Sequence, residues 1–236
     1  MPKRILPNLV EDEEFFKMFR DEAMINMRLE HPNIVRIHEF DESMGVHFIE
    51  MEYVAGDDMR RIEKTAAKLG VGIPIGSIVR IVADAAAGLD YAHKAKDARG
   101  RPLNLVHRDV SPQNILVGFD GSVKLIDFGV AKAAGRAQHT ATGILKGKFP
   151  YMSPEQATGK PVDARSDVFS LGIILWEFLT ARRLFKGAND AETQRLVRDC
   201  QVPRPSSVEP SVPPGLDSVV LRALAKEENL NIAQEF

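Results

Sequence analysis

Two aspartates near the middle of the chain stand at the ends of apolar runs, where an unpaired charge is costly. Asp109 lies within "LVHRDVSPQNILV" and Asp127 within "KLIDFGV". Burial of a carboxylate predicts a cation, a metal or a proton-transfer partner. Asn114 follows Asp109 by five residues, and an amide oxygen with the Asp127 carboxylate suits Mg²⁺, which takes substrate phosphates and waters as its other ligands. Asp109 is then left to accept a proton from a hydroxyl group. Phosphoryl transfer requires these roles.

Composition limits the class of protein. Of 236 residues, 44% are apolar and 27% charged, as in ordinary globular domains. A net charge of −2 gives no basic field for nucleic acid. The single cysteine, Cys200, fits a reducing compartment and a small packed side chain. The most apolar window, "VFSLGIILWEFLTA", is too short for a bilayer, and no secretory leader precedes the acidic run Glu11–Glu14. We expect a cytoplasmic protein without a membrane segment.

A small mixed part and a larger helical part must position these groups. A helical pattern runs from Glu11 to about Glu30 and ends at "HPN". Two strand-like runs, "IVRIHEF" and "VHFIEMEYV", follow around a turn. A second helix is predicted over Ser77–His93, and a long loop over about residues 130–155. Helical character dominates from Asp167 onward. Five prolines from Pro203 to Pro214 indicate an extended connection before the last helix.

At this point the motifs resemble those of the protein kinases. "HRDVSPQN" resembles the catalytic loop, "DFG" the magnesium loop, and "SPE" the close of the activation segment. "SDVFSLG" looks like the start of the buried helix whose aspartate, here Asp167, braces the catalytic loop. The resemblance runs from Lys3 to about Lys226. The proline of "HRDVSPQN" favours the serine/threonine class, and "HPNIV", "MEYVAG" and "YMSPEQ" look most like bacterial serine/threonine kinases.

The resemblance implies an α+β, two-lobed fold that binds ATP and Mg²⁺. Residues 1–53 correspond to an incomplete small β-lobe, and residues 54–236 to a mainly helical large lobe. By the same similarity Met51 is the gatekeeper, while Glu52 and Val54 offer backbone groups to adenine and Leu116 lies beneath the ring. For Met51 and Leu116, plain core packing is an equally open interpretation.

Lys3 and Glu22 are expected to form a pair. Glu22 falls three residues after Phe19, on the apolar face of the first helix, where a carboxylate needs a cation. "PKRILP" resembles the third strand of the kinase small lobe, with Lys3 where the family's lysine pairs with the helix glutamate and holds the α- and β-phosphates. The alternative is that both are solvated surface charges.

Both ends depart from the family pattern. A glycine-rich loop on two further strands normally precedes the lysine, whereas here Met1 and Pro2 precede it. We therefore expect a domain truncated before that loop, as a gene fragment or a degenerate kinase. The C-terminal run "EENLNIAQEF" has no arginine, although in the family an arginine there pairs with the residue matching Glu155. We expect Glu155 to lack this partner and the domain to be shortened at its C-terminus.

Inside the site, three departures from the family pattern carry hypotheses. Ser111 stands where the family usually has lysine, and Lys148 where it has threonine, so Lys148 could return a positive charge to Asp109 from the opposite side. The alternative is that Lys148 is a solvent-facing loop residue. Asn26 stands where an apolar residue usually packs on Phe128, and a polar group there needs a partner or water.

Two further interpretations concern His107 and the activation segment. His107 looks like a structural histidine stacked on the aromatic ring of "DFG". Thr140 and Thr142 lie in the activation segment, and Arg108 is the feature that accompanies control by loop phosphorylation in the family. A phosphate on either threonine could pair with Arg108 and Lys132. The alternative for this segment is a flexible polar loop.

The sequence therefore predicts a protein serine/threonine kinase that transfers the γ-phosphoryl of ATP to hydroxyl groups of a protein substrate. Lys3 and Glu22 would position phosphates, Asp109 would act on the hydroxyl, and Asn114 and Asp127 would hold Mg²⁺. The alternative is a catalytically dead, kinase-like interaction module or fragment. A small-molecule phosphotransferase is disfavoured, because the "DFG…SPE" segment serves to dock a peptide. The oligomeric state and the protein substrate are left open.

Overall fold

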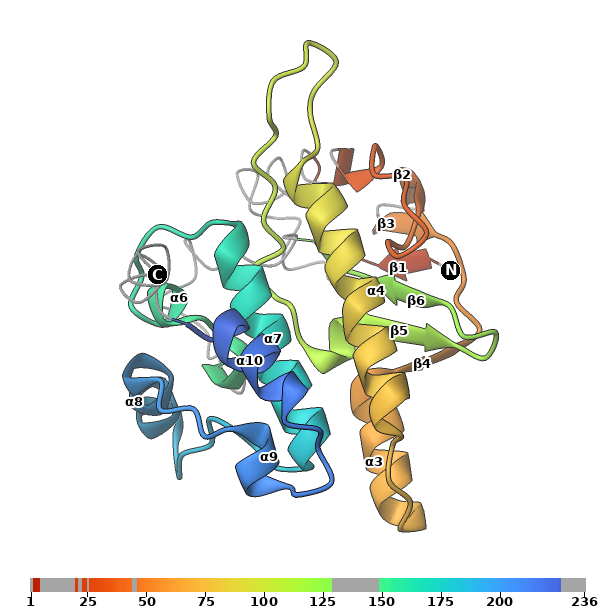
Figure 1. Ribbon diagram of the computed structural model, residues 1–236. Coiled ribbons are helices and arrows are strands. Elements are labelled where there is room, and N and C mark those ends of the chain that lie inside the picture. Colours follow the sequence, from red (N-terminus) through yellow and green to blue (C-terminus); the bar gives the residue numbers. More distant parts are fainter. Residues whose placement is uncertain are drawn as a thin grey trace.

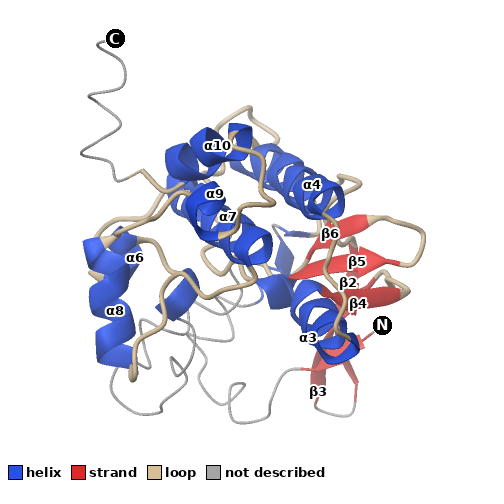
Figure 2. Cartoon of the chain, turned by 60° about the horizontal axis from the view of Figure 1, so that its bottom comes forward, coloured by secondary structure: helices blue, strands red, loops and turns tan. Residues whose placement is uncertain are grey.

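The computed structural model describes residues 2–4, for their backbone alone, and residue 20, residues 23–24, 26–43, 46–128 and 149–225. Two small antiparallel sheets lie beside a group of helices. In Figure 2 the strands gather on one side and most of the helices on the other. This is the mixed small part and larger helical part that the order of patterns predicts; the boundary between residues 53 and 54 stays a prediction.

The first sheet contains β1 (Pro2–Arg4), β2 (Ile37–Ser43) and β3 (Val46–Met51) in the order β1-β3-β2. Lys3 lies opposite Ile49 in this sheet. The two strand-like runs of the sequence are thus confirmed as β2, which lies three residues later than its run, and β3, which begins where its run begins and ends three residues earlier. Ile49 is buried, whereas its neighbour Glu50 is exposed, as alternation across a strand requires.

The second sheet contains β4 (Gly56–Asp58), β5 (Ile115–Gly118) and β6 (Val123–Leu125), also antiparallel. It joins the first through residues just before β2. The Val35 N–H donates to the Leu125 carbonyl, and the Leu125 N–H donates to the Asn33 carbonyl, both at 2.9 Å. The sheets therefore share a backbone seam at the end of β6, the strand that leads into Asp127.

The helices, in order along the chain, are α3 (Met59–Leu69), α4 (Ile75–His93), α6 (Pro154–Ala157), α7 (Ala164–Thr180), α8 (Asp190–Asp199), α9 (Pro205–Val208) and α10 (Gly215–Ala223). Short 3₁₀ turns cover Pro112–Asn114 and Phe149–Tyr151. Figure 1 shows α4 and α7 side by side with α10 next to α7, and α4 also contacts β6. The helix predicted over Ser77–His93 is confirmed as α4, two residues longer at its start.

Helix α7 forms the centre of the core. From Phe169 to Thr180 every residue is buried, which explains why the sequence shows no polar face there. Among the helices that the structure describes, none combines the length and the apolar character needed to cross a bilayer. The apolar window of α7 is thus accounted for by packing between α4 and α10.

Gly88 allows α4 to approach the seam between the sheets. A Cβ at this position would lie 3.1 Å from Leu125 Cδ1 and 2.8 Å from the Asn33 carbonyl oxygen, and the second distance is shorter than real Cβ contacts. The small residue in the alanine-rich stretch of α4 thereby fixes the distance between the helix and the strand that precedes Asp127.

Two elements differ from the prediction. Helix α3 was not predicted, although Asp58 caps its first turn by accepting the Arg61 N–H and Gly70 ends it in the left-handed region at φ 66°. The sequence between these start and stop signals is mostly polar and shows no apolar stripe, because only Met59 and Arg60 are buried. The proline-rich connection is not fully extended, because Pro205–Val208 forms a turn of helix with a proline at its favoured first position.

Candidate active site

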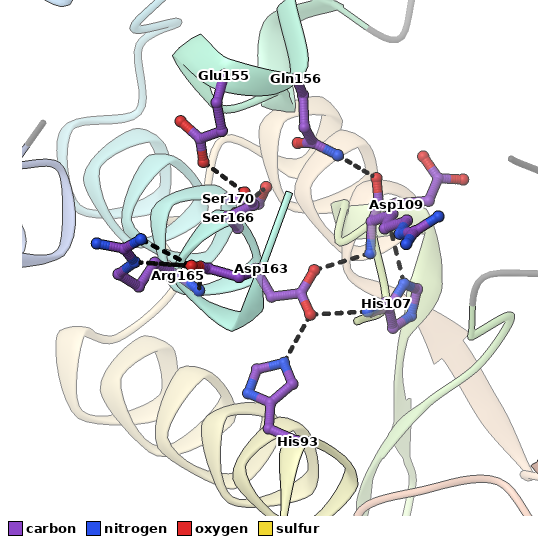
Figure 3. A network of polar contacts seen from close by, with 11 residues as sticks. His93, His107, Asp109, Glu155, Gln156, Asp163, Arg165, Ser166 and Ser170 are labelled. Atoms are coloured by element: carbon purple, nitrogen blue, oxygen red, sulfur yellow. Dashed lines mark hydrogen bonds and ion pairs between the residues drawn. The ribbon is translucent and has the colours of Figure 1, made fainter. Parts of the chain in front are cut away.

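Asp167, in the first turn of α7, holds the catalytic loop by its backbone. Its carboxylate accepts the N–H of His107 and the N–H of Arg108, each at 2.8 Å, and lies 2.7 Å from His93 Nε2. The side chain is 1% exposed, so hydrogen bonding to three donors offsets its desolvation. Figure 3 labels His93 in α4 and His107 in the loop, which interact with the Asp167 carboxylate through a ring nitrogen and a backbone N–H, respectively. The prediction that Asp167 braces the loop is confirmed.

His107 connects the loop to the segment that carries Asp127. Its ring lies 4.6 Å from the ring of Phe128, tilted by 41°, and its Nε2 is 3.0 Å from the Ile126 carbonyl oxygen. The Nδ1 atom accepts the Asp109 N–H at 3.4 Å. The expected contact between His107 and Phe128 is confirmed, and the hydrogen bonds make this fully buried histidine a positioning group.

Asp109 and Asn114 form the polar centre of the site. The Asn114 amide Nδ2 donates to the Asp109 backbone carbonyl at 2.8 Å and lies 3.4 Å from Asp109 Oδ2. The Asn114 backbone N–H donates to the Ser111 carbonyl, and its carbonyl accepts the Ile126 N–H at 3.1 Å. The structure thus brings together the two loop residues and the neighbour of Asp127.

The donor set fits Mg²⁺ held jointly with a nucleotide. Because the Asn114 amide nitrogen faces Asp109, its amide oxygen is the atom that can bind a hard cation. Asp127 supplies a carboxylate from a residue in the left-handed region, φ 63°. Within the described ranges no group of three or more His, Cys, Asp or Glu side chains could hold a metal. One amide and one carboxylate suit Mg²⁺, which completes its shell with phosphates and waters.

A small apolar cavity of about 30 Å³ lies between the first sheet and the Asp127 segment. Met51 lines it together with Asn26, Asp127 and Phe128, whereas Leu116 is not among its lining residues. Met51, the last residue of β3, therefore borders this cavity, and its role as gatekeeper stays a prediction. Leu116 lies in β5 opposite Asp58 and Lys124, and its role beneath adenine stays a prediction.

The segment after β3 contains a polar contact that sequence reasoning missed. The Glu52 carboxylate accepts the Lys124 ammonium and the Arg36 N–H, both at 2.8 Å, and the Glu52 N–H donates to the Arg36 carbonyl at 2.9 Å. Only the backbone of Glu52 was expected to act, toward adenine. The same role for Val54, two residues further on and half-buried, stays a prediction.

Several predicted site residues lie outside the part of the chain that the structure describes. They are Glu22, Lys132, Thr140, Thr142 and Lys148. Lys3 is placed by its backbone only, in β1, so its pairing with Glu22 stays a prediction. Arg108 is exposed, with φ 65°, and Ser111 precedes the 3₁₀ turn in an extended conformation. The hypothesis that Lys148 supplies the positive charge missing at Ser111 therefore stays a prediction.

The end of the activation segment is fixed to both the loop and α7. Ser153 and Gln156 form a capping box on α6, and Gln156 Nε2 donates to the Arg108 carbonyl at 2.8 Å. The Glu155 carboxylate accepts the hydroxyl of Ser166. Glu155 therefore has a hydroxyl partner from the first turn of α7 (Figure 3), whereas the expected lack of an arginine partner stays a prediction. The hydrogen bond from Gln156 thus connects α6 to the backbone of Arg108, which is in the left-handed region.

A buried charged network below this segment was not predicted. The Tyr151 hydroxyl donates to Glu177 at 2.6 Å and accepts from Arg60 and Arg183. Arg183 also donates to Glu177 at 2.6 Å. Burial, and then the charge of Glu177, raise the pKa of the Tyr151 phenol. Glu177 occurs singly in the apolar run of α7, and that isolated carboxylate was the available signal for the network.

This architecture, a two-sheet part against a helical part with the catalytic loop and magnesium segment between them, is the protein kinase fold. Solved structures agree: the chain matches the Mycobacterium tuberculosis PknI kinase domain with a TM-score of 0.68 and 29% identity, over 95% of this chain and 76% of that one. The family model described as "Protein kinase domain" matches residues 3–229. The chain belongs to the protein kinase family.

Curated relatives support the same assignment. The chain is 43% identical over 223 residues to "Tyrosine-protein kinase MasK" of Myxococcus xanthus, covering 94% of this chain and 34% of that protein. It is 38% identical over 230 residues to "Serine/threonine-protein kinase PknB" of Mycobacterium leprae, covering 95% and 35%. The chain thus spans about a third of the length of these relatives.

Proposed function

We propose that this chain is the catalytic domain of an ATP- and Mg²⁺-dependent protein serine/threonine kinase. The observation that carries the proposal is the junction of Asp109, Asn114 and the Asp127 segment: Asn114 donates to Asp109 through its side chain and accepts the Ile126 N–H through its backbone. One residue thereby couples the proton-accepting carboxylate to the metal-binding one.

Each group has a distinct role in this proposal. Asp109, half-buried beside Asn114, orients the acceptor hydroxyl and accepts its proton. The Asn114 amide oxygen and the Asp127 carboxylate hold Mg²⁺, which when bound offsets the charge of the transferring phosphoryl group. Lys3 and Glu22 position the nucleotide phosphates. Asp167 acts indirectly, because it fixes the backbone on both sides of the His107–Arg108 peptide.

The choice of serine or threonine as acceptor rests on Pro112 in "HRDVSPQN" and on relatives named as serine/threonine kinases at 35–38% identity. The name of the Myxococcus xanthus relative favours tyrosine as the second candidate. Phosphoamino-acid analysis of the product separates the two candidates directly, since the phosphorylated side chain is identified after hydrolysis.

Control by phosphorylation of Thr140 or Thr142 is part of the proposal. Arg108 is exposed next to Asp109, and a phosphothreonine beside it would form charge-assisted hydrogen bonds. Mass spectrometry of the active protein should find phosphate on one of these threonines. Full activity with both replaced by alanine would contradict this regulation.

The main test measures phosphate transfer from MgATP to a mixed Ser/Thr/Tyr peptide library. Asp109→Asn and Asp127→Ala should each lower turnover by about 10²-fold or more. Asp120→Asn is the matched control, because Asp120 lies exposed in the β5–β6 turn, where it accepts the Ser122 N–H, and its turnover should equal wild type. A folded chain that binds MgATP without transfer would support the non-catalytic, kinase-like alternative instead.

A further inference from the structure

Asn26 makes a buried contact with the segment that carries Asp127. Its amide Nδ2 donates to the Phe128 backbone carbonyl at 3.0 Å, across 102 positions of sequence. Asn26 is 6% exposed and Phe128 is equally buried. Both line the cavity that Met51 also lines. The polar side chain that the sequence placed beside Phe128 thus has a partner, and that partner is backbone.

Two further contacts of this segment come from the catalytic loop. The Ile126 N–H donates to the Asn114 carbonyl, and the Ile126 carbonyl faces His107 Nε2. Both of these contacts precede Asp127. The backbone hydrogen bond after Asp127, at the Phe128 carbonyl, comes instead from Asn26, a helical residue ahead of β2. The backbone of the segment is therefore hydrogen-bonded to the loop before Asp127 and to Asn26 after it.

Asp127 needs support on both flanks because its backbone is in the left-handed region, φ 63°. A residue with a Cβ adopts this conformation at a cost and keeps it only where its surroundings enforce it. An apolar side chain at position 26 could pack on Phe128 but would leave the buried carbonyl without its donor. The carboxamide of Asn26 supplies both packing and the hydrogen bond.

We propose that Asn26 is a positioning residue for Asp127: by fixing the Phe128 carbonyl, it couples the direction of the metal-binding carboxylate to the helical segment before β2. The proposal rests on the proposed function, because it assigns Asp127 to Mg²⁺. It also states that nucleotide affinity gained from Mg²⁺ depends on a side chain that touches neither the metal nor the nucleotide.

The test compares Asn26→Leu with Asn33→Leu. Asn33 is the matched control, because its Nδ2 also donates to a backbone carbonyl, but that carbonyl belongs to Val123 in β6, at 2.9 Å, and not to residues 126–128. Calorimetry gives the dissociation constant of ADP with EDTA and with saturating Mg²⁺ for each protein. The dissociation constant in EDTA divided by the constant in Mg²⁺ gives the factor by which Mg²⁺ raises the affinity for ADP.

Asn26→Leu should lower this ratio about fivefold, the equivalent of one lost hydrogen bond, whereas Asn33→Leu should keep the wild-type ratio even if its melting temperature falls. Asn26→Gln keeps the carboxamide, and the adjoining cavity has room for its extra methylene, so it should restore the ratio. If Asn26→Leu does not fold, Asn26→Ala removes the same donor.

An unchanged ratio in Asn26→Leu, or an equal fall in Asn33→Leu, overturns the inference. Failure of wild type to bind ADP overturns the proposed function instead, and amide hydrogen exchange then decides the positioning role by itself. Faster exchange of residues 126–128 in Asn26→Leu than in Asn33→Leu supports that role, and equal exchange in the two variants rejects it.

Discussion

The ammonium group of Lys124 lies 2.8 Å from the Glu52 carboxylate, which also accepts the Arg36 N–H. Lys124 belongs to β6 in the second sheet, whereas Glu52 directly follows β3 in the first. The two side chains are only 19% and 27% exposed, so solvent screens the pair less than a surface ion pair. One carboxylate therefore ties the two sheets together at the segment expected to hold adenine.

Lys124→Met should lower the free energy of unfolding by about 1–2 kcal/mol, because a charge-assisted and partly buried hydrogen bond is lost. Urea denaturation measures this change. Arg36→Met is the control, since the Arg36–Glu30 pair is mostly exposed and should contribute about 0.5 kcal/mol or less. Equal effects of Lys124→Met and Arg36→Met would show that the link between the sheets adds nothing.

Gly88→Ala should destabilise the protein by about 1–3 kcal/mol, because the new methyl group would meet the Asn33 carbonyl at 2.8 Å. Gly76→Ala is in the same helix with nothing within 4 Å of its Cβ, and should stabilise it by about 0.5–1 kcal/mol. Thermal unfolding of the two variants gives the comparison. A change in melting temperature of the same sign in both variants would contradict the close approach of α4 to the seam between the sheets.

Asp167→Ala should lower the free energy of unfolding by about 2–5 kcal/mol, because the N–H groups of His107 and Arg108 lose their acceptor. Asp163→Ala, which removes the N-cap of the same helix, should cost about 1 kcal/mol. Urea denaturation distinguishes the two. Similar losses would mean that the Asp167 carboxylate acts as an ordinary surface cap.

Tyr151→Phe should reduce the alkaline loss of stability. Burial and Glu177 raise the pKa of the Tyr151 phenol in the folded state, so above about pH 10 the unfolded chain ionises this phenol while the folded chain keeps it protonated. Unfolding then releases a proton, and the free energy of unfolding falls by up to about 1.4 kcal/mol per pH unit.

The measurement is urea denaturation of wild type and Tyr151→Phe between pH 9 and 11. Tyr53→Phe is the control, because it removes a hydroxyl from a ring that is 73% exposed. The slope with pH should be shallower in Tyr151→Phe alone. An identical slope in wild type and Tyr151→Phe would refute the protonated, buried phenol.

Much of the fold follows from patterns that are local in sequence. The apolar stripe of α4, the alternation in β3 and the apolar run of α7 each mark an element, since periodicity reflects burial. The Asp167 brace was also predictable, because a resemblance supplied its partner. Helix α3 shows the limit: its cap residues Asp58 and Gly70 were visible, but its mostly polar surface gave no apolar stripe to connect them.

The contacts that sequence did not reveal join distant residues of unlike type. Asn26 and the Phe128 carbonyl are 102 positions apart, and the acceptor is backbone, which leaves no trace in side-chain identity. Glu52 and Lys124 could each have stood in solvent, as most charges do. Tyr151, Glu177 and Arg183 become a network only once α7 is packed against the turn before α6. Such pairs are fixed by tertiary packing, so they became visible only in three dimensions.

Asp167 accepts hydrogen bonds from main-chain N–H groups, and Gln156 donates one to the Arg108 main-chain carbonyl. An anchor on the backbone does not depend on which side chain stands at position 108. A replacement of Arg108 by another residue that accepts the left-handed backbone, φ 65°, should therefore leave these hydrogen bonds of the loop in place. The shape of the loop at this point is thereby set by side chains of α6 and α7 that reach its backbone from outside.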